Sequence, residues 1–151
     1  MAVTGVDMEL PVRLLRAGAQ PPARTRPGDA GYDLRCLEGF ALEPGERLLV
    51  PTGIALALPP GVAGLVTPRS GLAIEHGVTT LNAPGLIDPN YRGEVCVILH
   101  NAGSEPYRAE AGDRIAQLLL VPFLTAETVV VDELPPSGDG RGEGGFGSSG
   151  R

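Results

Sequence analysis

Lysine is missing from this chain, and its absence excludes several kinds of phosphate and amine chemistry. All twelve basic residues among the 151 are arginine. A Walker A loop and a protein kinase each need a lysine against the phosphates, and Schiff-base chemistry needs a primary amine. None of these mechanisms can operate here. Codon bias also accounts for the absence, because alanine, glycine, proline and arginine are all abundant.

Cysteine and histidine are scarce, which argues against zinc sites and disulfides. The two cysteines, Cys36 and Cys96, are sixty residues apart and form no CxxC motif. His76 and His100 do not form an HExxH pattern, and no GxSxG sequence is present. A zinc hydrolase or a serine hydrolase therefore has no support. We expect two buried free thiols and assign neither a role.

Long apolar runs and a basic surface are lacking too. Asp7 and Glu9 interrupt the N-terminal segment where a signal peptide needs a continuous apolar core, and no run approaches membrane-spanning length. We therefore expect a cytoplasmic protein with no membrane partner. The formal net charge of −6 argues against a general nucleic-acid binder. A polyanionic substrate would need a metal ion or a few well-placed arginines.

Glycine and proline are abundant instead, with 22 and 15 residues, and leave little room for long helices. Short apolar runs between turn residues predict strands, and only Ser70–His76 reads as a helix, with Ser70 as its N-cap and Gly77 at its end. The expected fold is all-β, a jelly-roll-like β-barrel with one short helix. The predicted strands cover residues 12–15, 32–37, 47–50, 54–58, 62–67, 78–81, 95–101, 115–123 and 128–131.

The end of the chain differs in composition from the rest. Seven of the last fifteen residues are glycine, and such a segment cannot pack a core. We therefore divide the chain into a core of residues 1–131 and a linker with a flexible C-terminal arm, residues 132–151. A flexible tail without function is the simplest interpretation of this arm.

Several residues of the arm do not fit that interpretation. Arg141 is a fixed cation, and Phe146 is a lone aromatic among glycines that needs a partner elsewhere. The backbone amide of a glycine such as Gly147 and the hydroxyls of Ser148 and Ser149 can surround an anion. The arm is therefore a candidate lid that binds phosphate and stacks on a base.

Two segments in the middle of the chain also carry candidate chemistry. In the sequence PRSGLA, a strand runs into the predicted helix, where free amides, Arg69 and Ser70 can bind a phosphate. In NAPGLIDPNYRGE, Asp88 at a hairpin bend can orient and deprotonate a water, and Tyr91 can pack against a sugar so closely that a 2′-hydroxyl does not fit. A capped helix with a solvent-exposed arginine and an ordinary β-hairpin are the alternatives.

Two shorter segments complete the set of candidates. Asp33 lies in AGYDL, which also reads as an ordinary turn into a strand. Gln117 interrupts the apolar strand of GDRIAQLLL. A polar amide inside such a run suggests a ligand contact, although a hydrogen-bonded core glutamine would give the same pattern.

Together and in this order, AGYDL, PRSGLA, NAPGLIDPNYRGE, GDRIAQLLL and RGEGGFGSSG resemble the five motifs of the trimeric dUTPase family. The resemblance implies a homotrimer with active sites between subunits, in which the arm of one chain closes a site of its neighbours. It also implies a Mg²⁺-dependent dUTP diphosphatase that converts dUTP to dUMP and pyrophosphate. Such an enzyme keeps uracil out of DNA and supplies dUMP for thymidylate synthesis.

The resemblance assigns a role to each candidate residue. Asp88 would activate the water that attacks the α-phosphorus, Gln117 would contact the α-phosphate, and Asp33 would hold waters of a Mg²⁺ ion bound mainly by the triphosphate. The other residues would bind substrate: Arg69, Ser70 and Gly71 the phosphates, Asn82, Gly85 and Ile87 the uracil, Tyr91 the deoxyribose, Arg141, Ser148 and Ser149 the γ-phosphate, and Phe146 with Gly147 the outer face of the base.

Two other functions remain open at this point. A dCTP deaminase resembles the same fold, but Gly71 and Asp88 follow the dUTPase pattern. A non-enzymatic trimeric β-protein, such as a nucleotide sensor, would bind without turnover. Ser149 stands where threonine is common in the family, which exchanges one hydroxyl for another.

Overall fold

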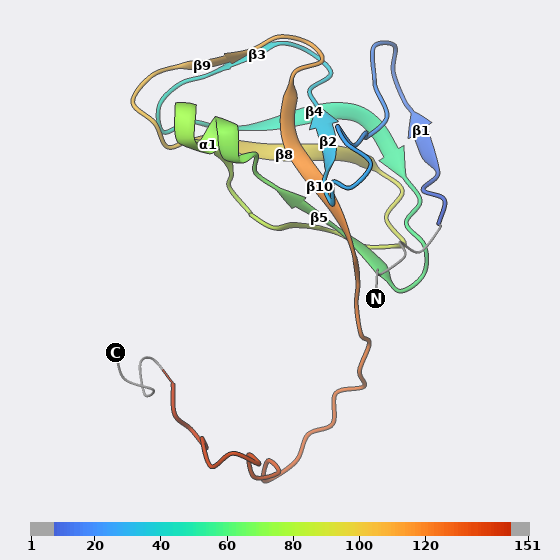
Figure 1. Ribbon diagram of the computed structural model, residues 1–151, viewed down its shortest axis with the longest axis vertical. Helices are drawn as coiled ribbons and strands as arrows, with labels where there is room; N and C mark the ends of the chain where they lie inside the picture. Colours follow the sequence, from blue (N-terminus) through green and yellow to red (C-terminus); the bar gives the residue numbers. More distant parts are fainter. Residues whose placement is uncertain (1–7, 146–151) are drawn as a thin grey trace.

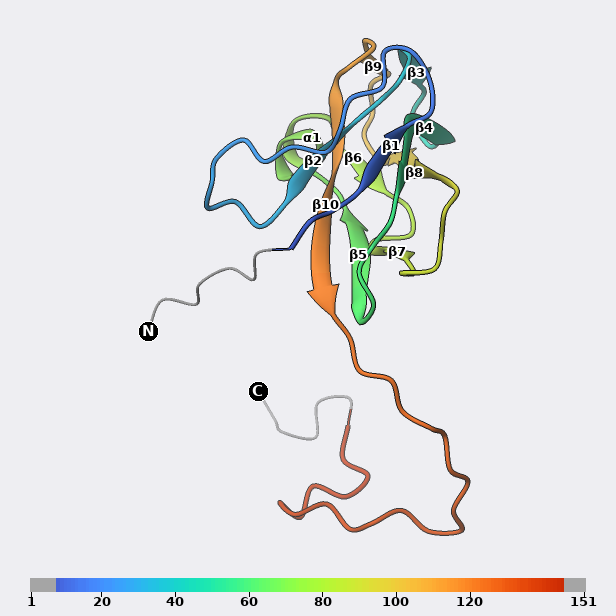
Figure 2. The same ribbon diagram turned by 90° about the vertical axis from the view of Figure 1, so that its right-hand side faces the viewer.

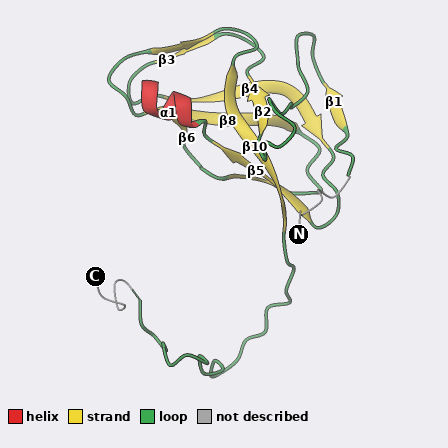
Figure 3. Cartoon of the chain, viewed as in Figure 1, coloured by secondary structure: helices red, strands yellow, loops and turns green. Residues whose placement is uncertain are grey.

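Short strands joined by turns make up most of the folded body, as the glycine and proline content predicts. The computed structural model describes residues 8–145. Within them, ten strands accompany one short helix (Figures 1 and 3). The elements are β1 (Val12–Leu14), β2 (Tyr32–Arg35), β3 (Phe40–Leu42), β4 (Arg47–Leu56), β5 (Val62–Thr67), α1 (Ser70–His76), β6 (Val78–Thr80), β7 (Gly85–Ile87), β8 (Glu94–Asn101), β9 (Tyr107–Ala109) and β10 (Arg114–Pro122).

The described strands form two antiparallel four-stranded sheets, in the orders β1-β4-β8-β6 and β2-β10-β5-β7, and β3 pairs with β9 separately. Every second residue of β8 is buried, because successive side chains of a strand point to opposite faces. Buried residues from both large sheets form one hydrophobic core. The prediction of an all-β, jelly-roll-like fold is confirmed.

Strand β4 continues through a position where the sequence predicted a break. Two strands were expected, over residues 47–50 and 54–58, but the structure has a single strand. Its register against β8 shifts at a bulge that contains Gly53, whose φ of 74° lies in the left-handed region that favours glycine. A bulge bends a strand without ending it, so the two predicted strands are one.

Short strands and an exposed segment account for the other differences. The strands β3, β7 and β9 have three residues each, too few for an alternating pattern to be recognised. The strand predicted over 128–131 is wrong for the described chain, where no strand pairs with it. Val129, Val130 and Val131 are 71%, 94% and 52% exposed. β-Branched residues favour a strand, but a strand also needs a neighbour for its backbone hydrogen bonds.

Helix α1 ends as predicted but starts differently. Its N-cap is Arg69, with φ −91° and ψ 129°, and no side chain caps the helix. The prediction of Ser70 as the N-cap is therefore wrong, because Ser70 is already the first helical residue. Gly77 ends the helix in the left-handed conformation, with φ 68° and ψ 17°.

The chain leaves the folded body after β10, which ends at Pro122. Residues 123–145 contain no helix or strand and run away from the sheets (Figures 1 and 2). The division of the chain at residue 131 remains a prediction. Among the described residues, no helix is long and apolar enough to cross a membrane.

Candidate functional site

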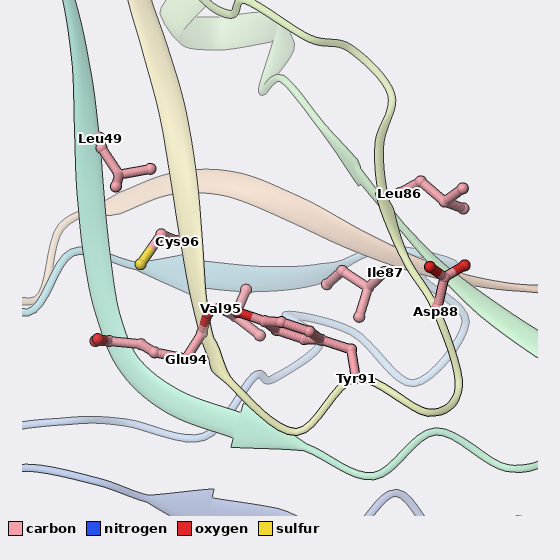
Figure 4. Close-up of a pocket in the computed structure, with 8 residues that line it drawn as sticks. All are labelled: Leu49, Leu86, Ile87, Asp88, Tyr91, Glu94, Val95 and Cys96. Carbon is pink, nitrogen blue, oxygen red and sulfur yellow. Dashed lines mark hydrogen bonds between the residues drawn. The ribbon is translucent and has the colours of Figure 1, made fainter.

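The described candidate residues of the body lie mostly in and around two pockets that share no lining residue. The arginine pocket has a volume of about 600 Å³ and the hairpin pocket one of about 340 Å³ (Figure 4). The arginine pocket is lined by Thr25, Arg26, Asp29, Ala30, Gly31, Asp33, Arg69, Ser70, Arg114, Gln117 and Leu119. The hairpin pocket is lined by Leu49, Leu86, Ile87, Asp88, Tyr91, Glu94, Val95 and Cys96.

Strand pairing brings three of the sequence motifs together in the arginine pocket. Strand β10 lies between β2 and β5, so Gln117 is opposite Asp33 on one side and Thr67 on the other. Thr67 is the last residue of β5, and the chain passes directly from it into Arg69 and α1. Residues that are far apart in the sequence therefore line one pocket.

A single carboxylate compensates two arginines in this pocket. Asp33 Oδ1 lies 3.5 Å from Arg69 Nε, and Asp33 Oδ2 lies 3.4 Å from Arg114 Nη1. The Thr25 hydroxyl donates to Asp33 Oδ2 at 3.1 Å. Arg26 adds a third guanidinium to the lining. A guanidinium binds phosphate oxygens through parallel charge-assisted hydrogen bonds, so the pocket is suited to a phosphate chain.

The ligand set for a metal ion is small. Among the described residues, no three His, Cys, Asp or Glu side chains come together to hold a metal. Asp33 is an oxygen donor of the kind that Mg²⁺ prefers, but its side chain is only 13% exposed and already paired with two arginines. A Mg²⁺ ion here would take most of its ligands from water and from a bound phosphate chain, with Asp33 accepting hydrogen bonds from those waters.

Gln117 owes its position to Gly31. A Cβ atom added to Gly31 would overlap Gln117 Oε1 and lie 3.4 Å from Gln117 Cδ. The amide of Gln117 therefore lies directly against the backbone of Gly31, which places it in the pocket lining and not in the core. Within residues 8–145 this side chain makes no hydrogen bond to protein atoms, so the amide is available to a ligand.

The start of α1 is open on the side of the arginine pocket. Ser70 is exposed, and its hydroxyl does not cap the helix. A Cβ added to Gly71 would have no neighbour within 4 Å. Packing in the described chain therefore gives no reason for a glycine at this position, whereas a ligand that approaches the backbone closely would give one.

The hairpin pocket is built around the turn that follows β7. The Tyr91 amide donates to Asp88 O at 3.0 Å and closes the turn. The Arg92 guanidinium donates to Pro89 O at 2.7 Å and to Tyr91 O at 2.9 Å. Asp88 is exposed, and its carboxylate has no hydrogen-bond or ion-pair partner among residues 8–145. It can accept a proton from water without first breaking an internal contact.

Two further candidates lie close to this turn. Gly85 is buried, and a Cβ there would lie 3.3 Å from Asn82 Nδ2 and 3.3 Å from Val66 Cβ. The Asn82 amide therefore lies against the Gly85 backbone. Ile87 lines the hairpin pocket, and its side chain lies on the side of Val95 and the Tyr91 ring (Figure 4). Asn82 and Gly85, in contrast, line neither pocket. We refer to Asn82, Gly85 and Ile87 as the slot.

The two cysteines are free, as predicted, but the prediction that both are buried is wrong for Cys96, which is half-buried at the pocket. Cys36 is buried, and its thiol donates to Glu110 O at 3.0 Å. Cys96 lines the hairpin pocket. Burial raises the pKa of the Cys96 thiol, the charge of Glu94 raises this pKa further, and the charge of Arg16 opposes the rise.

Four residues that contact the site residues were not predicted from the sequence. Arg114 and Thr25 both contact Asp33, and Arg16 pairs with Glu94. Arg114 and Glu94 lie inside motifs that were singled out, so their charge was an available signal. Thr25 and Arg16 lie in irregular segments, where no sequence pattern predicts a contact.

The predicted lid residues do not join either pocket in the described chain. Arg141 lies on the segment that runs away from the body, and its Nε donates to Gly144 O at 2.9 Å (Figure 1). Phe146, Gly147, Ser148 and Ser149 lie outside the described residues. Of the described candidate residues, the arginine pocket is lined by Asp33, Arg69, Ser70 and Gln117 and the hairpin pocket by Ile87, Asp88 and Tyr91, whereas neither is lined by Gly71, Asn82, Gly85 or Arg141.

Comparison with known proteins identifies the family. The dUTPase family model matches residues 18–150. A deoxyuridine 5′-triphosphate nucleotidohydrolase from Anaeromyxobacter sp. (strain Fw109-5) is 53% identical and covers 95% of this chain and 100% of its own. A mutant Staphylococcus bacteriophage 80alpha dUTPase, solved with dUpNHpp, has a TM-score of 0.85 at 33% identity over 95% of this chain and 99% of that one.

A second solved structure concerns a metal ion. It is a mutant dUTPase from phage phi11 of S. aureus, described as revealing the coordination of a structural Mg(II) ion, with a TM-score of 0.76 at 30% identity over 83% of this chain and 98% of that one. The family model covers nearly the whole chain, and the bacterial relative is similar over its full length. This chain belongs to the dUTPase family.

Proposed function

We propose that this protein is a dUTP diphosphatase, which hydrolyses dUTP to dUMP and pyrophosphate. The observation that carries the proposal is the carboxylate of Asp88, which has no partner among residues 8–145 and lies at a turn that also presents Ile87 and Tyr91 to one pocket. The bacterial relative bears the name of this activity, and the phage dUTPase binds dUpNHpp, which supports dUTP as the substrate.

Asp88 is the base of the proposed reaction. Its carboxylate accepts a proton from a water molecule, and the oxygen of that water attacks the α-phosphorus in line with the bond to the leaving pyrophosphate. General-base catalysis contributes about 10²–10⁴-fold to the rate in such reactions. The exposed position of Asp88 leaves its lone pairs available to that water.

The slot beside Asp88 is the proposed uracil site. Asn82 and the backbone around Gly85 read the donors and acceptors of the base, and Ile87 bounds the slot. A slot of fixed width rejects the methyl group of thymine, and a hydrogen-bonding edge rejects cytosine because its pattern is reversed. The Tyr91 ring contacts deoxyribose and leaves no room for a 2′-hydroxyl.

The arginine pocket is the proposed phosphate site. Arg69, Ser70 and the backbone at Gly71 bind the phosphates, and Gln117 contacts the α-phosphate. Mg²⁺, when bound, neutralises the triphosphate and orients it. Asp33 would hold this ion through its waters, and its ion pair with Arg69 holds that guanidinium beside it in the pocket lining.

A homotrimer with shared sites is part of the proposal. The two pockets of one chain share no lining residue, and in the proposed trimer each dUTP molecule uses the two pockets from different chains. The segment after β10 carries large exposed apolar side chains that find no core within residues 8–145: Leu124, Val129, Val130 and Leu134 are 99%, 71%, 94% and 83% exposed. Burial against another copy removes this surface from water.

The arm completes the shared site. Arg141, Ser148 and Ser149 bind the γ-phosphate, and Phe146 with Gly147 covers the base. The proposed substrate is a free deoxynucleotide of the cytoplasm. The proposal therefore includes the cytoplasmic location that the sequence predicts.

A panel of the four deoxynucleoside triphosphates plus dUTP, with and without Mg²⁺, tests the function. We expect pyrophosphate and dUMP from dUTP only, and a large loss of rate without Mg²⁺. Ammonia released from dCTP would identify a deaminase instead. Tight binding of dUTP with no turnover would identify a sensor.

Shared sites are tested by mixing two inactive proteins. One carries Asp88→Asn, and the other lacks residues 138–151. Subunit exchange between them forms some sites with both an intact base and an intact arm, so we expect partial recovery of activity. Mixed trimers without any recovery would mean that each chain closes its own site.

A further inference from the structure

An ion pair joins Arg16, which lies outside the five motifs, to Glu94, which lines the hairpin pocket. One terminal nitrogen of Arg16, Nη2, reaches both carboxylate oxygens of Glu94, at 2.6 and 2.7 Å. The two residues are 78 positions apart in the chain, and their side chains are 46% and 23% exposed. Pairs this exposed add only about 0–1 kcal/mol to stability, so a role in positioning is the stronger explanation.

The Arg16 segment is held in place from the other side by the bulge in β4. The Leu15 amide donates to Gly53 O at 2.8 Å, and a Cβ on Gly53 would lie 2.8 Å from Ala19 Cβ. The Gly53 amide in turn donates to Glu94 Oε1 at 2.8 Å. Arg16 therefore approaches Glu94 from a fixed backbone, and the carboxylate is held by two donors.

Glu94 also holds Tyr91, through its backbone. The Tyr91 hydroxyl donates to Glu94 O at 2.9 Å. The ring lies against Gly93, where a Cβ would be 2.6 Å from Tyr91 Cζ. In Figure 4 the ring extends from the turn toward the start of β8, beside Val95 and Glu94. The position of residue 94 therefore sets the orientation of the ring in the pocket.

We propose that Arg16 is a positioning residue for Tyr91: by holding Glu94 it fixes the tyrosine ring and thereby sets the preference for dUTP over UTP. The inference rests on the proposed contact between Tyr91 and deoxyribose. Without Arg16, the Glu94 carboxylate keeps only the Gly53 amide and turns toward water. The start of β8 then becomes more mobile, and the Tyr91 ring is no longer held in one orientation. The pocket can then accept the 2′-hydroxyl of a ribose.

The test compares kcat/KM for dUTP with kcat/KM for UTP in the Arg16→Gln protein. We expect the dUTP/UTP ratio to fall by about tenfold, the order of one hydrogen bond. The ratio is independent of how much enzyme is folded, so a purely structural role of Arg16 leaves it unchanged. The matched control is Arg108→Gln, which removes the same charge from an exposed position on β9 and should keep the wild-type ratio.

Combination with Tyr91→Phe tests the route from Arg16 to the ring. This variant lacks the hydroxyl that bonds to Glu94, so its ratio should fall similarly, and adding Arg16→Gln should lower it no further. An unchanged ratio in Arg16→Gln, or a second full decrease in the double variant, overturns the inference. If Tyr91→Ala lowers the dUTP/UTP ratio but Arg16→Gln does not, only the role of Arg16 is refuted. If Tyr91→Ala leaves the ratio unchanged, the proposed contact between Tyr91 and deoxyribose is refuted as well.

Discussion

Gly31→Ala should reproduce the kinetic effect of removing the Gln117 amide. The added Cβ would overlap Gln117 Oε1 and no backbone atom, so the glutamine side chain moves and the fold stays. Gly31 has no positive φ, so alanine adds no backbone strain. The proposed contact of Gln117 is a hydrogen bond to a charged phosphate, worth about 1.5–3 kcal/mol, and its loss lowers kcat/KM by about 10- to 100-fold.

Steady-state kinetics with dUTP, together with thermal unfolding, give the measurement. Gln117→Ala should lose activity by a similar factor, and the double variant should lose little more, because both changes remove the same contact. Gly28→Ala is the matched control, since a Cβ there has no neighbour within 4 Å. Full activity in Gly31→Ala, or losses that multiply in the double variant, would refute the role of the amide.

Three other changes have expected outcomes. Asp88→Asn should lower kcat by about 10²–10⁴-fold while dUTP binding, measured by calorimetry, is retained; an active variant excludes Asp88 as the base. Deletion of residues 138–151 should leave the protein folded by circular dichroism but nearly inactive, and full activity would remove the lid. Glu94→Gln should lower the pKa of the Cys96 thiol and speed its alkylation by iodoacetamide at pH 8, whereas Arg16→Gln should raise this pKa and slow the reaction. Mass spectrometry across pH follows the alkylation. The opposite order of rates would show that the two charges do not act on the thiol.

Much of the fold could be predicted from local patterns. Apolar runs between turns predicted the longer strands, and the glycine after His76 predicted the end of α1. Two of the errors have one physical origin, because each depends on a neighbour that the local sequence does not contain. Gly53 indicates a break between two strands, but its pairing region with β8 shows a bulge inside one strand. Residues 128–131 have the composition of a strand, but no strand of the described chain pairs with them.

The candidate site shows the same division. The motifs identified which residues to examine, but not that Asp88 and Asp33 lie in pockets without a common residue. They also did not predict that Asp33 pairs with two arginines or that Gln117 lies against Gly31. These contacts join segments across the sheet, and a sequence pattern of short range contains no information about them.

If each active site takes its two pockets from different chains, as proposed, the enzyme behaves differently when it is scarce. A lone chain then holds no complete site, so dilution abolishes turnover while each polypeptide stays natively folded. Specific activity should then fall steeply below the concentration at which chains associate. In a cell that makes both the wild-type chain and an inactive variant, the two would form mixed oligomers. Active sites that take one pocket from each would be inactive, although a wild-type chain contributes to them.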